Sequence, residues 1–342
     1  MKILYLPCHS VHEYDEVRLL HEIGHEPFSP GAYFNPQCDE FLRPGIPGLT
    51  YDPEIVNQYH ELGGRFPGED AKDHLTRDFV DNFDCVMVMS LRRWVECNWD
   101  AIKHKPVILR TNGQSNEDYE KFVYKYRSEN SNFKAVRYSP KEDQFPFYGG
   151  SDAVIRFGKK IDEFPEWEGN LKELATLVQH MKGRGDACNW NTFYELSNKI
   201  QCKLYGMSNE DAGDLWFVRK TEFNETFELL KQHRCYFYAG TKPANYTLNF
   251  IEMLCIGMPI IAVGALLGND HNLNTYEIPD LIEHGVNGFI SNDISEIESI
   301  AKELFNNDDL AKNISIESKK LAYKYFDEKN VRKEWHDFLK SL

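Results

Sequence analysis

Apolar residues in this chain gather in short runs, and longer stretches of mixed polarity separate one run from the next. Short apolar runs rich in β-branched and aromatic residues predict buried strands, and the longer mixed stretches predict helices. In the first half the expected strands are Lys2–Pro7, His25–Ser29, Cys85–Ser90, Val107–Arg110 and Phe133–Tyr138. In the second half they are Leu174–His180, Cys202–Tyr205, Leu215–Val218, Tyr236–Ala239 and Ile260–Val263.

Helices are expected between these strands, which makes the pattern a repeated alternation of strand and helix. The expected helices are Val17–Ile23, Leu91–His104, Asn116–Ser128, Trp190–Lys199, Glu222–Gln232, Thr247–Ile256, Ile294–Phe305 and Glu317–Leu342. This alternation predicts the α/β class with parallel sheets. A connection rich in Asp, Glu, Pro and Trp at 153–169 divides it into two series. We therefore expect two doubly wound Rossmann-like domains facing across a cleft, 1–157 and 158–320.

Length and charge narrow the choice of partners. The 342 residues suffice for two domains of ordinary size. The formal net charge is −15, and no long basic run occurs. A broad basic surface for nucleic acid or for an anionic membrane is therefore not expected. A local cationic pocket for a phosphate remains open.

Cysteine usage and the absence of long apolar stretches predict a cytoplasmic protein. The eight cysteines are scattered, with no CxxC and no Cys/His cluster at zinc spacing, so a reducing compartment is favoured and no metal site is expected. The apolar run at the start is too short for a signal peptide, and no apolar stretch of transmembrane length occurs. A glycan on the Asn245 sequon would obstruct the candidate site described next.

The stretch Tyr236–Val263 carries the strongest local signal. Thr247 suits a helix N-cap, Gly257 suits the left-handed position after the helix, and Pro259 forbids its continuation. Glu252 stands in an otherwise apolar part of this helix, where an unpaired buried carboxylate is very costly. Glu252 is therefore partly exposed, paired with a Lys or Arg, or directed into a cleft beside an anion-binding helix N-terminus.

Several nucleotide-binding and hydrolase motifs are missing from the sequence. It holds no G-x-x-x-x-G-K-[ST] loop, no G-x-G-x-x-G after the first strand, no G-x-S-x-G elbow and no early D-x-D. A phosphate site built from backbone amides and basic side chains is still compatible with the chain. Lys182-Gly183-Arg184-Gly185, which follows the first strand of the second half, fits such a site. An ordinary exposed turn is the alternative. In a parallel sheet this loop lies on the same edge as the loop before Thr247.

Residues from about 170 to 342 resemble the nucleotide-binding half of GT-B glycosyltransferases, most closely the retaining family 4 group. The segments that carry the resemblance are 250–262 (FIEMLCIGMPIIA), 278–290 (IPDLIEHGVNGFI), Tyr325-Phe326 and Trp335. The resemblance implies that a terminal helix, here 321–342, crosses back to the first domain. It also implies an enzyme that moves a sugar from a nucleoside diphosphate sugar to a hydroxyl acceptor, with retention and without a metal ion or cofactor.

The resemblance assigns roles to residues of the second half. Glu252 matches the glutamate that holds the donor ribose, and Lys182 and Arg184 occupy the loop that supplies the basic diphosphate contacts. The remaining donor-binding candidates are Tyr246, Thr247 and Leu248 at the helix start, Gly240 and Thr241 in the preceding loop, and Arg219 near the nucleobase.

The chain departs from the family pattern at two places. The family has two glutamates eight positions apart, and the first falls on Ala244. The glycine-rich loop after the first strand is replaced by a segment holding His9, His12, Glu13, Asp15 and Glu16. These residues form either a solvated helix start or a sugar-binding loop. The candidates for acceptor or sugar contacts are His9, His12, Asp15, Arg110 and Asn112.

Other functions stay open at this stage. A sugar-nucleotide epimerase or a phosphorylase-like enzyme of the same architecture is one alternative. A non-catalytic member that binds a glycan or a partner protein is another, because Ala244 lacks the expected carboxylate. Residues 34–75, rich in Pro and Gly, are expected to shape the choice of acceptor.

Overall fold

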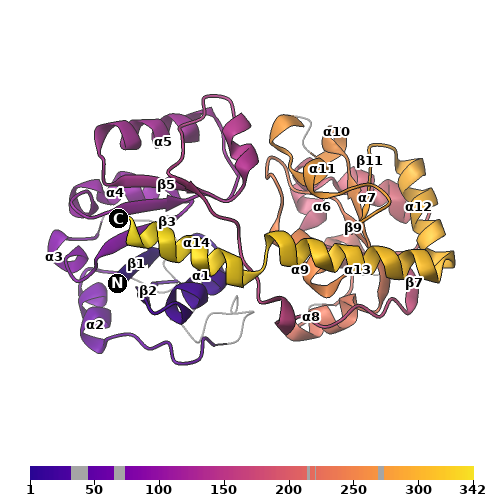
Figure 1. Ribbon diagram of the computed structural model, residues 1–342, viewed down its shortest axis with the longest axis horizontal. Helices are drawn as coiled ribbons and strands as arrows, with labels where there is room; N and C mark the ends of the chain where they lie inside the picture. Colours follow the sequence, from indigo (N-terminus) through magenta and orange to yellow (C-terminus); the bar gives the residue numbers. More distant parts are fainter. Residues whose placement is uncertain (32–44, 65–73, 214–215, 220, 269–272) are drawn as a thin grey trace. The chain divides into compact units, whose positions relative to one another are not determined.

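The computed structural model describes residues 1–31, 45–64, 74–213, 216–219, 221–268 and 273–342. The chain forms two compact units (Figure 1). The first consists of Met1–Gly158 together with Lys329–Leu342, and the second is Lys159–Glu328. Both units are built on a parallel sheet with helices, which confirms the expected α/β class. Within the segment expected to shape acceptor choice, 34–44 and 65–73 lie outside the described residues.

The first unit contains a six-stranded sheet in the order β2-β1-β3-β4-β5-β6. Its strands are β1 (Lys2–Leu6), β2 (Glu26–Phe28), β3 (Cys85–Met89), β4 (Val107–Arg110), β5 (Phe133–Arg137) and β6 (Ala153–Val154). Every neighbouring pair is parallel. All residues of the central strand β3 are buried, as expected for a strand covered on both faces.

Six helices accompany this sheet in the described residues. They are α1 (Ser10–Glu22), α2 (Pro53–Glu61), α3 (Arg77–Val80), α4 (Arg92–Ile102), α5 (Glu117–Glu129) and α14 (Glu328–Lys340). Trp94 from α4 and Trp335 from α14 are among the largest fully buried side chains. The C-terminal helix, yellow in Figure 1, thus packs into the first unit, as the sequence predicted for the end of the chain.

The second unit contains a five-stranded parallel sheet in the order β11-β10-β9-β7-β8. Its strands are β7 (Leu171–Leu177), β8 (Cys202–Tyr205), β9 (His233–Tyr238), β10 (Ile260–Val263) and β11 (Phe289–Ser291). Its helices are α6 (Met181–Arg184), α7 (Trp190–Ser197), α8 (Phe223–Leu230), α9 (Leu248–Ile256), α10 (Ala265–Gly268), α11 (Ile278–Leu281), α12 (Ile294–Asn306) and α13 (Asp308–Tyr325). Helix α12 packs against β7, β9 and β10, and α13 packs against α9.

Three sequence predictions of elements need correction. The first helix begins at Ser10 and not at Val17, because the His9 side chain caps it. The apolar pattern did not indicate this start, since most residues of the first two turns are polar. The predicted C-terminal helix is two helices, since Phe326 leaves the helical conformation between α13 and α14. Within the expected strand Leu215–Val218, Phe217 forms only an isolated bridge to Leu204, and Leu215 lies outside the described residues.

Candidate active site

The loop after β7 holds the two basic residues singled out in the sequence. It contains α6 and a 3-10 turn, η4 (Gly185–Cys188). The buried side chain of Asn209 fixes it, because its Oδ1 accepts from the Met181 N–H at 2.7 Å and its Nδ2 donates to the Val178 carbonyl at 2.6 Å. The loop that holds Lys182 and Arg184 is therefore a short helical turn with a fixed position on the sheet edge.

Both cations of this loop are on the surface. Lys182 and Arg184 are exposed, and the Lys182 ammonium donates to the Asp211 carbonyl at 2.5 Å. A Cβ at Gly183 would lie 1.8 Å from the His180 ring nitrogen, so the imidazole now occupies the space beside this glycine. Gly185 has φ +55 and nothing within 4 Å of such a Cβ. Of the two glycines, Gly185 alone leaves the backbone open to the close approach that the sequence predicted.

The loop after β9 lies beside this first loop. The Lys242 N–H donates to the Ala187 carbonyl at 2.8 Å, and Asn189 Nδ2 donates to the Ala239 carbonyl at 2.6 Å. The Lys242 ammonium lies 3.3 Å from the Asp186 carboxylate. The expectation that both loops lie on one edge of the sheet is therefore confirmed.

Lys242 is a cation of this site that the sequence did not single out. Its side chain is 7% exposed and stands between the two loops. The sequence predicts donor contacts for Gly240 and Thr241 of this loop and none for Lys242, although a lysine just after a buried strand is itself a signal. Gly240 has φ +75, a left-handed conformation that favours glycine. Thr241 is buried and interacts with the Cys188 thiol.

Helix α9 begins at this edge with its first amides uncapped by a side chain. Thr247 takes the N-cap position with φ −124 and ψ 162, but its hydroxyl makes no capping bond and lies 3.0 Å from the Tyr238 hydroxyl. Asn249 Nδ2 donates to the Leu177 carbonyl at 2.5 Å, so the first turn is tied to the end of β7. The first turn holds no acidic residue. This helix start therefore keeps the partial positive charge that favours an anion.

The two neighbours of Thr247 differ in exposure. Tyr246 is 2% exposed, and its ring packs against Phe326 with 5.5 Å between ring centroids. Leu248 is half-buried. The side chain of Tyr246 is thus part of the core. Of this residue, only the backbone would contact a ligand.

Glu252 lies one turn further along α9 and is 4% exposed. The Lys159 ammonium donates to its Oε1 at 2.9 Å, and the Lys159 side chain is 2% exposed. Of the three alternatives for this carboxylate, the pair with a basic residue is therefore present. The sequence did not identify Lys159, because it lies 93 positions away.

Arg219 stands apart from these groups. It is exposed and forms an ion pair with Glu225 near the start of α8. Its neighbour Val218 donates its N–H to the Leu204 carbonyl on β8 at 2.9 Å. Arg219 therefore follows a segment that is hydrogen-bonded to the edge strand β8.

In the first unit, the three candidates after β1 lie at the N-cap and in the first two turns of α1. His9 is exposed and caps this helix, its Nδ1 accepting from the Val11 N–H at 3.2 Å. The His12 ring packs on Phe157 with 4.5 Å between centroids. Asp15 is 6% exposed. His9 is therefore the candidate on this helix that solvent reaches most freely.

Arg110 is an interior residue, contrary to its expected role in contacting substrate. It has no exposed surface, and its Nε donates to Glu16 Oε1 at 2.7 Å. Its Nη1 donates to the Ile155 carbonyl at 2.5 Å, and its guanidinium lies over the Phe157 ring. Burial raises the pKa of Glu16, and the Arg110 charge opposes this. We assign Arg110 to the core and no longer to the acceptor candidates.

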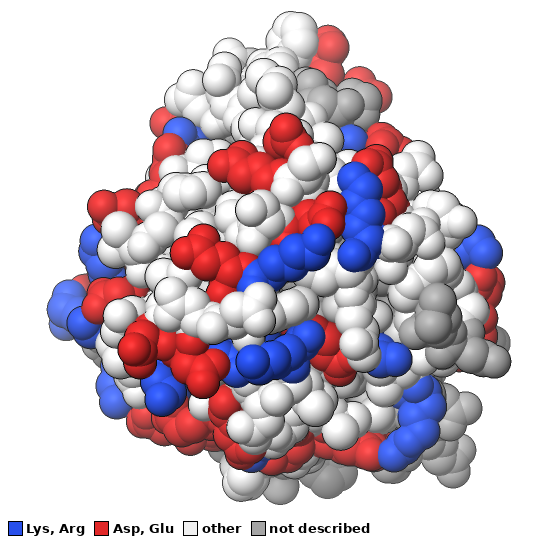
Figure 2. Space-filling model, turned by 90° about the vertical axis from the view of Figure 1, so that its right-hand side faces the viewer, with Lys and Arg blue, Asp and Glu red and all other residues white. Residues whose placement is uncertain are grey.

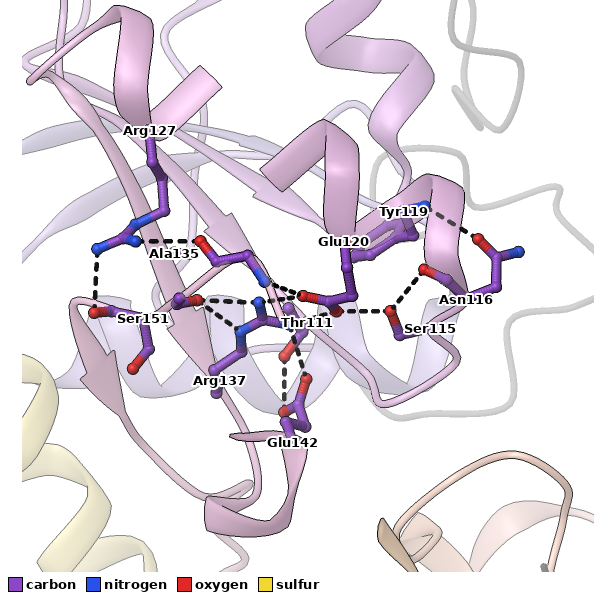
Figure 3. A network of polar contacts seen from close by, with 12 residues as sticks. Thr111, Ser115, Asn116, Tyr119, Glu120, Arg127, Ala135, Arg137, Glu142 and Ser151 are labelled. Carbon is purple, nitrogen blue, oxygen red and sulfur yellow. Dashed lines mark hydrogen bonds and ion pairs between the residues drawn. The ribbon is translucent and has the colours of Figure 1, made fainter. Parts of the chain in front are cut away.

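A second buried arginine organises the carboxyl ends of β4 and β5 (Figure 3). Arg137 lies between two buried carboxylates, with Nη2 2.7 Å from Glu120 Oε2 and Nη1 3.4 Å from Glu142 Oε2. Burial raises the pKa of Glu142, and Arg137 and the Thr111 hydroxyl oppose this. Asn112 follows this network, and its Oδ1 accepts from the Ser90 hydroxyl at 2.8 Å. Asn112 remains half-buried.

The described residues hold no group of three or more His, Cys, Asp or Glu side chains arranged to bind a metal ion. Among the described helices, none is long and apolar enough to cross a membrane. On the face of the molecule in Figure 2, Lys and Arg lie among Asp and Glu and form no continuous basic patch.

Comparison with known proteins places the fold. No protein-family model matches the chain, and no curated protein sequence matches it. Solved structures do match. Anabaena Alr3699/HepE in complex with UDP has a TM-score of 0.68 at 13% identity, with 100% of both chains covered. Sucrose-phosphate synthase from Thermosynechococcus elongatus has a TM-score of 0.69 at 11% identity, covering 100% of this chain and 98% of that one.

A third similar structure is a glycosyltransferase from Rickettsia africae ESF-5, with a TM-score of 0.63 at 14% identity and coverage of 99% and 98%. At these identities the likeness concerns the fold. It confirms the expected GT-B architecture over the full length of the chain.

Proposed function

We propose that this protein is a retaining, metal-independent and cofactor-independent glycosyltransferase that moves a sugar from a nucleoside diphosphate sugar to a hydroxyl acceptor. One observation carries the proposal: two hydrogen-bonded loops and the uncapped start of α9 meet at the carboxyl edge of one parallel sheet. Ligands of open α/β sheets bind at that edge. The solved structures of similar fold include complexes with UDP and UDP-glucose, so a UDP-sugar is the first donor to test.

The diphosphate lies, in this proposal, at the start of α9. The backbone amides there and the helix dipole favour the anion. Lys182 and Arg184 are exposed on the neighbouring loop, where their long side chains can approach the same phosphates. As the bond between the sugar C1 and the phosphate oxygen breaks, these donors stabilise the charge that develops on the leaving diphosphate.

Glu252 holds the ribose in this proposal. Its carboxylate is buried beside the Lys159 ammonium, and a carboxylate oxygen accepts more than one hydrogen bond. No nucleophile for a covalent step is assigned. The acceptor oxygen therefore attacks the sugar C1 from the face that the diphosphate leaves, and the leaving phosphate takes the acceptor proton. New glycoside and free nucleoside diphosphate are the two products.

The test is a product assay by mass spectrometry, with UDP-glucose and other sugar nucleotides, each with and without a panel of hydroxyl acceptors. We expect nucleoside diphosphate release that depends on an acceptor, together with a new glycoside. Replacing both Lys182 and Arg184 by Met should lower kcat/KM by about 100-fold or more, as for other preorganised donors. Lys320→Met is the matched control, since Lys320 is an exposed cation on α13 paired with Glu317.

A second candidate function rests on Ala244. This residue is buried where the similar family has a glutamate, and it offers no carboxylate to the sugar. It favours a non-catalytic protein that binds a nucleotide sugar or a glycan. Binding of a sugar nucleotide without turnover would support this candidate over the transferase. Conversion of the sugar nucleotide to an isomer without any acceptor would support an epimerase instead.

A further inference from the structure

Lys159 lies at the point where the chain enters and leaves the second unit. Its N–H donates to the Phe326 carbonyl at 2.8 Å, and its carbonyl accepts from the Glu328 N–H at 3.0 Å. Lys159 and Asp327 form a parallel bridge. The two chain segments that connect this unit to the rest of the molecule are therefore joined at Lys159.

The side chain of Lys159 points away from solvent and toward α9. It is 2% exposed, and its Nζ is 2.9 Å from Glu252 Oε1. Burying an ammonium group away from water is unfavourable unless a charged partner compensates. Glu252 supplies that partner, and the lysine in turn favours the ionised form of the carboxylate.

The place where these two chain segments meet, which we call the crossing, also packs against the start of α9. The Phe326 ring contacts Tyr246, just before the helix, and Phe250 in its first turn, with centroid distances of 5.5 Å and 6.5 Å. Phe326 also accepts the Lys159 N–H through its carbonyl. The crossing thus holds both the Glu252 carboxylate and the uncapped helix start, which fixes the two groups relative to each other.

We propose that Lys159 is a positioning residue for nucleotide binding. By holding Oε1 it fixes the Glu252 carboxylate in the orientation that accepts hydrogen bonds from the ribose hydroxyls. This inference rests on the proposed function, in which Glu252 binds the ribose. Lys159 itself touches no substrate. A carboxylate left without its cation at this depth would take up a proton or turn away, and the ribose would lose an acceptor.

The experiment compares the dissociation constants of UDP and 2′,3′-dideoxy-UDP, measured by isothermal titration calorimetry on the full-length protein. The two probes differ only in the hydroxyls that Glu252 would bind. We expect the wild-type protein to bind UDP about 10- to 100-fold more tightly than the dideoxy analogue, the range for hydrogen bonds to a charged group.

In Lys159→Met that preference should fall to about threefold or less, through weaker UDP binding at nearly unchanged binding of the analogue. A merely structural lysine would weaken both probes alike. Lys159→Arg keeps the charge and should retain most of the preference. Lys160→Met is the matched control, because Lys160 is the neighbouring lysine and pairs with Glu163 in a partly exposed position. It should bind both probes as the wild type does.

The outcomes separate this inference from the proposed function. If Lys159→Met folds and keeps the wild-type preference for UDP, the positioning role is wrong and the proposed donor site stands. If the wild type binds UDP without preferring it over the analogue, Glu252 is no ribose ligand and the positioning role is wrong with it. If the wild type binds neither probe, the same comparison is made with GDP and ADP and their dideoxy analogues, and binding of none of them overturns the proposed function as well. Should Lys159→Met not fold, Lys159→Gln is judged by the same preference.

Discussion

Arg110, Arg137 and Lys159 are buried cations, and each faces a carboxylate from another element of its own unit. Their partners are Glu16, Glu120 and Glu252, at N–O distances of 2.7, 2.7 and 2.9 Å. Removing one member of a buried pair leaves an uncompensated charge, which is worse than removing both. These pairs therefore fix the places of α1, α5 and α9 by their charge as well as by packing.

Arg110→Met tests this view in the first unit. It leaves Glu16 buried with only the Tyr5 hydroxyl, 2.9 Å away, as a described partner. We expect the free energy of unfolding to fall by about 3–5 kcal/mol. The double variant Arg110→Met/Glu16→Gln should lose less, because the buried charge is gone. Urea unfolding measures both. If the Arg110→Met protein has wild-type stability but a raised KM for the acceptor, Arg110 contacts the substrate and this view is wrong.

Glu173 gives the second unit a dependence on pH. Burial raises the pKa of Glu173, but the bond and charge of His233 and the charge of Lys203 outweigh it, so the net pKa is lowered. A carboxyl whose pKa is lowered on folding stabilises the protein above its unfolded pKa of about 4.3, and this contribution is lost as pH falls through the folded value.

We therefore expect Glu173→Gln to make stability less dependent on pH below about 4.5. Above that pH the variant should be less stable than the wild type. Urea unfolding at a series of pH values measures the difference. Parallel stability curves for the two proteins across this range would show that Glu173 does not carry the effect.

At the scale of elements, the sequence predicted best where local chemistry decides the structure. Gly257 and Pro259 end α9 after Ile256, as expected, with Gly257 at φ +82. The strand β4 spans the predicted Val107–Arg110, because it lies inside the sheet and all its residues are buried. Prediction was poorer where a distant partner decides. The start of α1 contains Glu13 and Glu16, which the apolar pattern excluded and which buried partners stabilise.

The same difference between local and distant determinants applies to the residues of the candidate site. Lys182, Arg184, Thr247 and Glu252 are candidates that residue type and position indicate, because each follows a strand or lies on an apolar helix. Lys159 was missed, since its role depends on a contact across 93 positions. Arg110 was misplaced, because a sequence does not reveal whether the residue at the end of a strand faces solvent or the core.

The side chain of Asn209 holds the loop after β7 in place through hydrogen bonds to Met181 and Val178. Asn209→Ala leaves the Met181 N–H and the Val178 carbonyl without this partner. We expect a stability loss of about 1–3 kcal/mol and a UDP affinity about tenfold lower, because the loop that carries Lys182 and Arg184 loosens. Hydrogen exchange at 178–188 and calorimetry measure the two effects.

Asn198→Ala is the control for that experiment. Asn198 Nδ2 donates to the Tyr194 carbonyl at the exposed end of α7, away from this loop. It should leave UDP affinity unchanged. An Asn209→Ala protein with slow exchange in the loop and normal UDP affinity would contradict the role given to Asn209.

At the scale of the whole molecule, the second unit supplies all the donor-binding residues of the proposed function. Every proposed donor residue lies in Lys159–Glu328, a continuous stretch of chain. The first unit, in contrast, is completed by the last residues of the chain. Val331, Trp335 and Leu339 of α14 are each buried to within 2% exposure. The end of the chain therefore stabilises the first unit without contributing a donor ligand.

Truncation after Glu328 tests this division. It removes three buried apolar side chains from the first unit, each worth about 2–5 kcal/mol when deleted from a core. We expect the first unit to unfold at a lower urea concentration than in the full-length protein. Hydrogen exchange of the backbone amides in β3 and β4 measures this unfolding. UDP affinity should change by less than about threefold. Loss of UDP binding at low urea, with the second unit still protected from exchange, would show that the donor site is not confined to Lys159–Glu328.

The central claim is that the second unit binds a nucleoside diphosphate through α9 and its neighbouring loops. Its most direct test is calorimetric titration of the wild-type protein and of Glu252→Ala with UDP, GDP and ADP. We predict saturable one-to-one binding of at least one nucleotide by the wild type. In Glu252→Ala that binding should be about 10- to 100-fold weaker. No binding of any of the three nucleotides by the folded wild-type protein would contradict the account.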